Sequence, residues 1–254
     1  MRRPRSADFR SRLFRLFPRV VHPDFTAPIY FQRRPTPRNR LARLLLGAFV
    51  WNYDLVMVER VVELPWVFQN LDLPRGAKIL DFGCSQSPLA LHLASLGYRV
   101  TGVDLRPYGF VHPDLRLVEG DFLKSGFTDG EFDAVVAVSA VEHTGLGAYG
   151  EPRANQADRR IIAEFHRVLR PGGRLLLTVP YGRRGETSWY RVYDRGSLEE
   201  LLSPLSIARI DYYAGIGRTA WSPVSSEEIA RIDSVRCGYA QGVACVVALN
   251  PSTE

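Results

Sequence analysis

The sequence has little lysine and little cysteine. Lys78 and Lys124 are its only lysines, so arginine supplies nearly all of the 33 cationic side chains. The three cysteines, Cys84, Cys237 and Cys245, are too few for a disulfide framework, and no Cys or His pair has the spacing of metal ligands. We therefore expect a reducing, cytoplasmic compartment, no structural disulfide and no metal centre.

Long apolar runs are also absent. The longest, residues 44–51, falls well short of the roughly 18 residues that identify a membrane-spanning helix. The first 20 residues lack the uninterrupted apolar centre of a secretory signal. The remaining composition, 46% hydrophobic and 24% charged, is ordinary for a globular protein and excludes wholesale disorder.

Positive charge is concentrated near the start of the chain. Residues 1–44 contain twelve arginines against two aspartates, a net charge of +10, whereas the whole chain carries +6, so the rest is acidic at −4. In residues 1–21 apolar side chains recur at helical spacing between arginines, which is typical of an amphipathic helix on an anionic membrane surface. The alternatives are a helix packed on the body with its arginines in solvent, and a targeting or nucleic-acid-binding segment.

The pattern divides the chain into three parts. Residues 1–37 form a basic arm that prolines interrupt, residues 38–74 a helical cap of two helices with a break at Pro65, and residues 75–254 an alternation of strands and helices. The expected strands are 79–82, 99–104, 115–119, 132–139, 174–180, 207–213 and 243–249, and the expected helices between them are 89–96, 158–169 and 197–202. Such alternation predicts a parallel sheet with ligands at the carboxyl ends of its strands.

The first strand of this sheet ends in a motif suited to a ligand. Asp81 lies near its end, and the small residues from Gly83 to Ser87 let the backbone approach a ligand closely. The helix that begins just beyond favours the carboxylate or phosphate end of that ligand.

Acids also end the next two strands. Asp104 closes the second strand, where a carboxylate can accept both hydroxyl hydrogens of a ribose. Asp121 follows the third strand, where it can accept a hydrogen bond from an adenine amine, and Phe122 can pack on the ring face. Together these positions favour an adenosine-containing cofactor.

Residues 78–180 resemble the class I S-adenosylmethionine-dependent methyltransferases, of the small-molecule group called type 11. The resemblance rests on KILDFGCSQSPLALHLASLGYRVTGVDL, VEGDF, FDAVVAVSAVEH and EFHRVLRPGGRLLLTVPYG. It implies a Rossmann-like α/β fold with a seven-stranded sheet, six strands parallel and the seventh antiparallel, and helices on both faces. Ser85 and Ser87 replace the family's usual second and third glycines, so a nicotinamide GxGxxG turn cannot be drawn here.

The resemblance also implies which residues hold the cofactor, S-adenosylmethionine. They are Asp81, Gly83, Cys84, Ser85, Ser87, Asp104, Leu105, Asp121, Phe122 and Ser139. Ser139 ends the fourth strand, beside the position of the reacting methyl group.

Candidates for the chemical step and for the methyl acceptor follow the fourth and fifth strands. Glu142 or His143 can serve as a general base, or the pair can shape the pocket without moving a proton. The glycine-rich residues 144–157 are typical of a lid, and residues 214–241 of a cap insertion. Four side chains are expected to contact the acceptor or, equally, to pack the insertion against the sheet: Tyr181, Trp189, Tyr190 and Arg191.

These features predict methyl transfer to a small molecule or to a glycan or glycolipid. The glycan acceptor rests on EHTGLGAYGEP, which resembles a subgroup associated with cell-envelope biosynthesis. If residues 1–21 form the membrane-surface helix, the enzyme is expected to be held peripherally at the inner membrane surface. One alternative is a catalytically inactive methyltransferase-like protein that binds a partner or a membrane. Another is an RNA methyltransferase that uses the basic arm, although nucleic acid is not the expected partner. The oligomeric state stays open.

Overall fold

A computed structural model of the protein describes residues 31–35, 53–217 and 219–251. The chain separates into two compact units, residues 1–58 and residues 59–254. In the first unit strand β1 (Phe31–Pro35) pairs antiparallel with strand β2 (Tyr53–Met57). The expected amphipathic helix in residues 1–21 lies outside the described residues, and the boundaries at 37 and 74 stay predictions.

The prediction of two helices between residues 38 and 70, with a break at Pro65, is wrong in the part that the structure describes. Residues 53–57 are the strand β2, and the one helix in this part, α3 (Arg60–Asn70), continues through Pro65. A proline inside a helix costs roughly 3 kcal/mol. Burial of the flanking Leu64 and Trp66 offsets this cost, since each large apolar side chain contributes about 1.5–3 kcal/mol.

The second unit is built on one large sheet. Its strand order is β11-β10-β12-β7-β6-β3-β4-β5. The strands are β3 (Lys78–Phe82), β4 (Arg99–Asp104), β5 (Leu115–Glu119), β6 (Phe132–Val138), β7 (Leu169–Pro180), β10 (Ser206–Ile216), β11 (Ala220–Pro223) and β12 (Gly242–Leu249). Strands β3 to β7 of this sheet pair in parallel, and β12 runs antiparallel between β7 and β10.

This arrangement confirms the expected fold class, with one strand more than expected. The additional strand β11 pairs antiparallel with β10 at the edge of the sheet, inside the predicted insertion 214–241. Two short helices complete that insertion, α7 (Ser226–Ile229) and α8 (Ser234–Cys237). Because β10 runs on to Ile216, the insertion begins as a continuation of the sheet.

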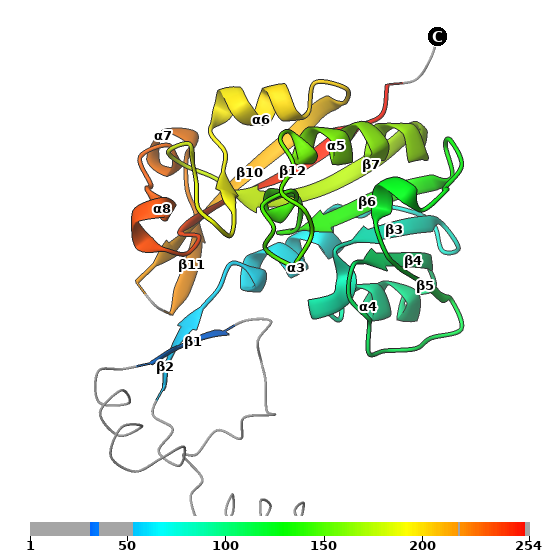
Figure 1. Ribbon diagram of the computed structural model, residues 1–254, viewed down its shortest axis with the longest axis horizontal. Helices are drawn as coiled ribbons and strands as arrows, with labels where there is room; N and C mark the ends of the chain where they lie inside the picture. Colours follow the sequence, from blue (N-terminus) through cyan, green and yellow to red (C-terminus); the bar gives the residue numbers. More distant parts are fainter. Residues whose placement is uncertain (1–30, 36–52, 218, 252–254) are drawn as a thin grey trace, which may run out of the picture. The chain divides into compact units, whose positions relative to one another are not determined.

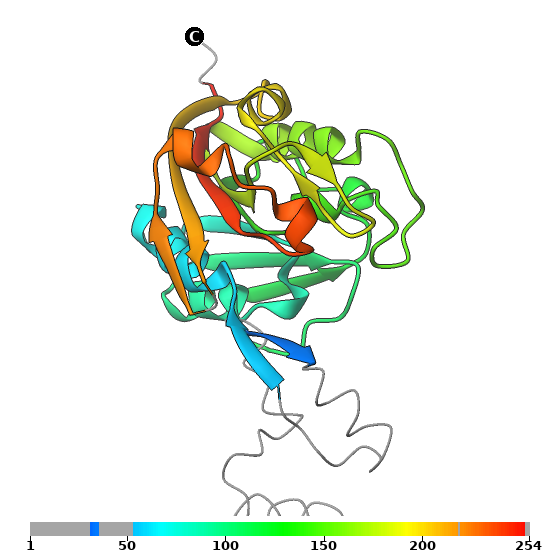
Figure 2. The same cartoon turned by 90° about the vertical axis from the view of Figure 1, so that its left-hand side faces the viewer.

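Helices cover both faces of the sheet (Figures 1 and 2). Helix α3 contacts β6, β7 and β12 and helix α4 (Leu89–Ser95) contacts β4 and β5. Helix α5 (Ala157–Val168) and helix α6 (Arg195–Leu201) lie over the opposite face. No helix in the described part of the chain has the length and apolar character needed to span a bilayer.

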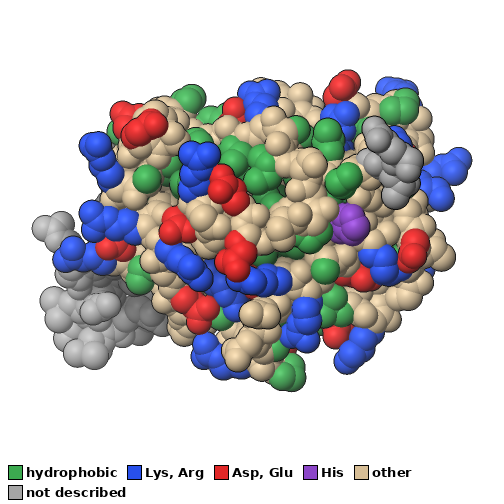
Figure 3. All heavy atoms as spheres, turned by 90° about the horizontal axis from the view of Figure 1, so that it is seen from above, with side chains coloured by type: hydrophobic (Ala, Val, Ile, Leu, Met, Phe, Trp, Pro, Cys, Tyr) green, Lys and Arg blue, Asp and Glu red, His purple; other side chains and the backbone are tan. Residues whose placement is uncertain are grey.

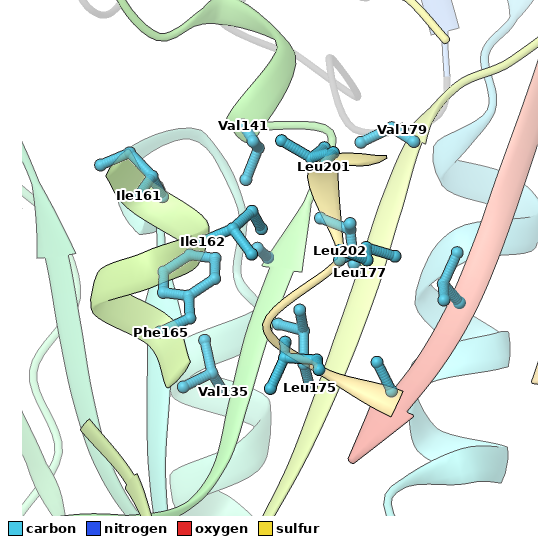
Figure 4. Packing of buried hydrophobic residues seen from close by; sticks show 14 of the residues in the cluster. Val135, Val141, Ile161, Ile162, Phe165, Leu175, Leu177, Val179, Leu201 and Leu202 are labelled. Atoms are coloured by element: carbon cyan, nitrogen blue, oxygen red, sulfur yellow. The ribbon is translucent and has the colours of Figure 1, made fainter. Parts of the chain in front are cut away.

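The core beneath α5 and α6 holds the central strands in place (Figure 4). Phe165 and Ile162 of α5 pack with Val135 of β6 and with Leu175 and Leu177 of β7, all fully buried. Strand β6 is almost entirely buried, as a central parallel strand covered on both faces should be. The packing fixes the carboxyl ends of β3, β4 and β6 at one edge of the sheet.

Candidate functional site

The turn after β3 is held against the segment after β6. Gly83 has a φ of +76°, in the left-handed region that favours glycine. A Cβ atom at this position would lie 2.6 Å from the Cβ of Ala140. No larger residue fits without displacing one of the two segments, so the backbones meet closely at the carboxyl edge.

The acid at the end of β4 closes onto this turn. The backbone amide of Ser85 donates a hydrogen bond to Oδ2 of Asp104 at 3.0 Å. Arg106 donates to Oδ1 of the same carboxylate through its backbone amide at 2.9 Å and its Nε at 3.2 Å. The structure thus brings the two predicted positions together and adds Arg106, which the sequence analysis did not single out.

The acid near the end of β3 is buried. Burial, against the opposing effects of Arg60 and the backbone amide of Ala90 and with a smaller contribution from Asp104, raises the pKa of Asp81 to about 7. Oδ2 of Asp81 has no hydrogen-bond partner in the structure. A buried carboxyl oxygen without a partner is unusual, because such atoms are nearly always hydrogen-bonded.

Cys84 and Ser87 line the back of the same turn. The Cys84 side chain is 2% exposed and lies against Gly102 of β4. The Ser87 hydroxyl accepts a hydrogen bond from the backbone amide of Leu89 at 3.2 Å, at the start of α4. Both side chains therefore support the turn, Cys84 against β4 and Ser87 at the start of α4.

Ser139 directly follows β6 in a strained conformation, with a φ of +43°. Its backbone amide donates to Oγ1 of Thr178 at 3.0 Å, and its hydroxyl donates to Oε1 of Glu63 at 2.6 Å. Glu63 belongs to α3 and is fully buried. The sequence analysis missed Glu63, although one acid inside the apolar stretch VVELPWV was a usable signal.

Arg60, one turn before Glu63 on α3, reaches the same edge. Its Nη1 donates to the carbonyl oxygen of Val138 at 2.8 Å, and its Nε lies 3.7 Å from Oε2 of Glu63. Helix α3 therefore supplies an arginine and a glutamate to the end of β6.

Glu142 and His143 follow Ser139 in a short 3-10 turn. Burial raises the pKa of Glu142 well above its usual value, and Glu63 raises it further. Nδ1 of His143 lies 2.5 Å from the carbonyl oxygen of Trp189, so this nitrogen carries the proton. Burial lowers the pKa of His143, which favours the neutral imidazole, with Nε2 at 3.6 Å from Oε1 of Glu142.

Three aromatic rings meet beside this turn. The His143 ring lies 5.7 Å from Tyr149 of the loop 144–157 and 5.3 Å from Trp189, and the Tyr149 and Trp189 rings are 5.0 Å apart. The guanidinium of Arg106 stacks over Tyr149 at 4.1 Å from the ring centroid. The expected lid thus contacts both the acid-ended strand β4 and the turn after β6.

Three other residues expected at the methyl acceptor have partners on β10, in the insertion and in the loop 144–157. Tyr181 is 2% exposed, and its ring lies 5.0 Å from Tyr212. The Tyr190 hydroxyl donates to the Ser234 carbonyl oxygen at 3.0 Å. Arg191, on strand β9 (Arg191–Val192) of a short hairpin with β8 (Gly185–Glu186), donates to the Thr144 carbonyl oxygen at 2.7 Å. Trp189 is the one of the four that joins the aromatic group.

The positions predicted at the adenine separate into exposed and buried ones. Leu105 is 45% exposed, and Oδ1 of Asp121 accepts a hydrogen bond from the Leu123 backbone amide at 3.0 Å. The Phe122 ring lies in the core, 5.4 Å from Phe165. Its side chain therefore packs beneath α5, which differs from the expected stacking on a cofactor ring.

Buried oxygens without hydrogen-bond partners gather at this edge. In the described residues there are four such side-chain atoms: Oε2 of Glu63, Oδ2 of Asp81, Oγ of Ser85 and Oε2 of Glu142. They belong to α3, to β3 and the turn after it, and to the turn after β6. Their number and nature suit a ligand that donates several hydrogen bonds, as the amine and hydroxyl groups of S-adenosylmethionine do.

Parallel strands with acids at their carboxyl ends, a tight glycine turn and an antiparallel β12 define the class I S-adenosylmethionine-dependent methyltransferase fold. The chain contains such a domain: residues 80–177 match the family model of the methyltransferase domain. A crystal structure of 1,6-didemethyltoxoflavin-N1-methyltransferase from Burkholderia thailandensis, with S-adenosylhomocysteine bound, superposes with a TM-score of 0.51 at 16% identity and covers 75% of this chain and 77% of its own. At that identity the likeness concerns the fold.

Curated relatives match part of the chain. A ubiquinone biosynthesis O-methyltransferase from Xanthomonas oryzae pv. oryzae is 35% identical over 128 residues, covering 46% of this chain and 48% of the relative. A sterol 24-C-methyltransferase from Gibberella zeae is 29% identical over 120 residues, covering 42% of this chain and 29% of the relative. The match thus spans about half or less of the length of these relatives.

Proposed function

We propose that the protein transfers a methyl group from S-adenosylmethionine to a small-molecule acceptor. The observation that carries this proposal is the pair of buried oxygens without hydrogen-bond partners, Oδ2 of Asp81 and Oγ of Ser85, which precede and follow Gly83 in the chain at the carboxyl edge of the sheet. S-adenosylmethionine, when bound, supplies the activated methyl group. The residues of the chain bind and orient the cofactor and the acceptor, and they exclude water from the site.

The cofactor would lie along the ends of β3 and β4. Asp104 would accept hydrogen bonds from the ribose hydroxyls, and Arg106 would yield one of its two contacts with that carboxylate. Asp81 and Ser85 each offer an oxygen without a partner to the polar end of the cofactor. The remaining contacts are proposed for Gly83, Cys84, Ser87, Leu105, Asp121 and Ser139.

The methyl acceptor would approach from the turn after β6. His143 is neutral there, so Nε2 can accept the proton of a hydroxyl group. The exposed Trp189 and its neighbour Tyr149 offer flat apolar faces, which suit a sugar or another ring. A glycan or glycolipid acceptor is therefore our finer proposal.

Surface charge gives no support to a nucleic-acid substrate on the face above α5 and α6. Figure 3 shows cationic and anionic side chains interspersed on this face. Arg159 pairs with Glu200 at 2.7 Å and Arg195 with Glu199 at 2.9 Å. A nucleic-acid footprint needs a continuous basic surface, which these pairs interrupt.

Calorimetric titration with S-adenosylmethionine tests the first half of the proposal. We expect binding by the full chain, a loss of at least tenfold in affinity for Asp104→Ala, and no loss for the exposed Asp129→Ala. Methyl transfer is then followed with S-adenosylmethionine labelled in the methyl group and a panel of hydroxylated rings and sugars. Absence of binding, or equal binding by Asp104→Ala, would rule out the proposed function.

A further inference from the structure

Two buried carboxyl side chains from separate parts of the chain lie near the end of β6. Glu63 comes from α3 and Glu142 from the turn after β6, and they are 0% and 1% exposed. Oε1 of Glu63 accepts the hydroxyl proton of Ser139 at 2.6 Å. Glu63 raises the pKa of Glu142, so the two carboxyl groups interact electrostatically.

In the described residues, this part of the site contains more acidic than basic side chains. Burial, together with Glu63, raises the pKa of Glu59, at the start of α3, to about 7. Arg60 is the cation beside these carboxyls, and its Nη1 is hydrogen-bonded to the Val138 carbonyl. His143 is held neutral, so it adds no compensating charge. Among the described residues, one guanidinium thus lies near these three carboxyl groups, and the raised pKa values of Glu59 and Glu142 reflect the cost of a buried negative charge without a partner.

Each of the two glutamates keeps one oxygen without a hydrogen bond. Oε2 of Glu63 lies 3.7 Å from Nε of Arg60, beyond hydrogen-bond distance, and Oε2 of Glu142 has no hydrogen-bond partner. Oε1 of Glu142 lies 3.6 Å from Nε2 of His143. Two deeply buried oxygens on different elements therefore remain to be satisfied by a donor that enters the site.

We propose that the methyl acceptor carries a protonated amine, which the carboxyl groups of Glu63 and Glu142 bind beside Ser139. An ammonium group has three N–H donors, so it can reach oxygens on both α3 and the turn after β6. Its positive charge also stabilises the ionised form of the carboxyl groups, which burial disfavours. A hydroxyl group has one donor and no charge, so it satisfies one of the two oxygens and does not stabilise the ionised carboxyl groups.

The cofactor's own amine is a rival occupant of the same oxygens. The side of the site formed by β3 has its own unpartnered oxygens, on Asp81 and Ser85, which are the ones proposed for the cofactor. Glu63 and Glu142 come from α3 and from the turn after β6, with Ser139 and His143. Since the cofactor's amine already has the oxygens of Asp81 and Ser85, this second pair favours the acceptor amine, and the two occupants are distinguishable by experiment.

The inference rests on the proposed function and is tested with the full chain saturated with S-adenosylhomocysteine. Cyclohexylamine and cyclohexanol, which match in size and differ in the amine, are titrated by saturation-transfer NMR. We expect wild type to bind the amine at least tenfold more tightly than the alcohol, since charge-assisted hydrogen bonds are about twice as strong as neutral ones. Glu63→Gln and Glu142→Gln should each bring the ratio to within twofold, while the exposed Glu199→Gln on α6 should keep it.

Each outcome separates the two proposals. If S-adenosylhomocysteine does not bind, the proposed function fails. If it binds but wild type shows no amine preference, or both glutamine variants keep the preference, this inference alone is overturned. It is also overturned if the variants lower only the affinity for S-adenosylhomocysteine, because the glutamates then bind the cofactor's amine. If Glu63→Gln does not fold, the result for Glu142→Gln alone tests the inference, since Glu142 makes no hydrogen bond to Ser139.

Discussion

The hydroxyl of Ser139 donates a hydrogen bond to Glu63 across 76 positions of the chain, and so joins the end of β6 to a helix that precedes the sheet. Glu63 is fully buried, and Ser139 has a left-handed backbone conformation. The bond satisfies one oxygen of a buried carboxyl group, and the other oxygen has no hydrogen-bond partner. Helix α3 is therefore part of the candidate site.

Ser139→Ala should destabilise the protein by about 1–3 kcal/mol, because it leaves Oε1 of Glu63 buried without its donor. Urea denaturation of wild type and variant measures the difference. Ser206→Ala, at an exposed position that begins β10, is the matched control and should change stability by less than about 0.5 kcal/mol. Equal stabilities of wild type and Ser139→Ala would show that the hydrogen bond contributes nothing.

Gly83→Ala should lower both stability and affinity for S-adenosylmethionine. The added methyl group meets the Cβ of Ala140 at 2.6 Å, and the φ of +76° is itself unfavourable for alanine by about 1–2 kcal/mol. Gly126 has a φ of +69° with nothing within 4 Å of a Cβ, so Gly126→Ala carries the backbone cost alone. Calorimetry should show that Gly126→Ala retains cofactor affinity. The same loss in both variants would contradict the steric explanation.

The stability of wild type relative to Asp81→Asn should fall as the pH rises from about 4 to 7. Burial raises the pKa of Asp81 from 3.8 to about 7, so in this range the folded protein binds a proton that the unfolded chain has released. The contribution of Asp81 to the free energy of unfolding is largest at low pH and decreases as the pH rises to about 7. Above that pH it changes no further. Urea denaturation at pH 5 and pH 8 measures it, with Asp129→Asn as the control. If the difference in free energy of unfolding between wild type and Asp81→Asn is the same at pH 5 and pH 8, Asp81 is ionised in the folded protein at both pH values.

Trp189→Ala should lower kcat/KM for the methyl acceptor about tenfold or more while leaving the affinity for S-adenosylmethionine within twofold. The side chain is 47% exposed, and its ring contacts His143 and Tyr149 beside the turn after β6. Leu96→Ala, 48% exposed at the end of α4, controls for loss of surface apolar area. A loss of cofactor affinity instead would place Trp189 at the cofactor.

The strands of the sheet could be predicted closely from the sequence. The structure has β4 at Arg99–Asp104 and β5 at Leu115–Glu119, the bounds that the apolar runs and the following turns indicate. A central strand such as β6 was predicted because burial on both faces demands continuous apolar residues, a signal that is local. The edge strand β5 is partly exposed, and the turn at Gly120 marks where it ends. Strand β2 was missed because five residues at an ambiguous spacing can be read as a helix.

The sequence by itself determined the alternation of strands and helices and the acids at Asp81 and Asp104, since both follow from local patterns and turn chemistry. Only the tertiary structure decided that Glu63 reaches Ser139, that Arg106 stacks on Tyr149, and that Phe122 turns into the core. These relationships depend on how α3 and the loop 144–157 pack against the sheet. Packing joins residues that are distant in sequence, and no periodicity along the chain records such pairs.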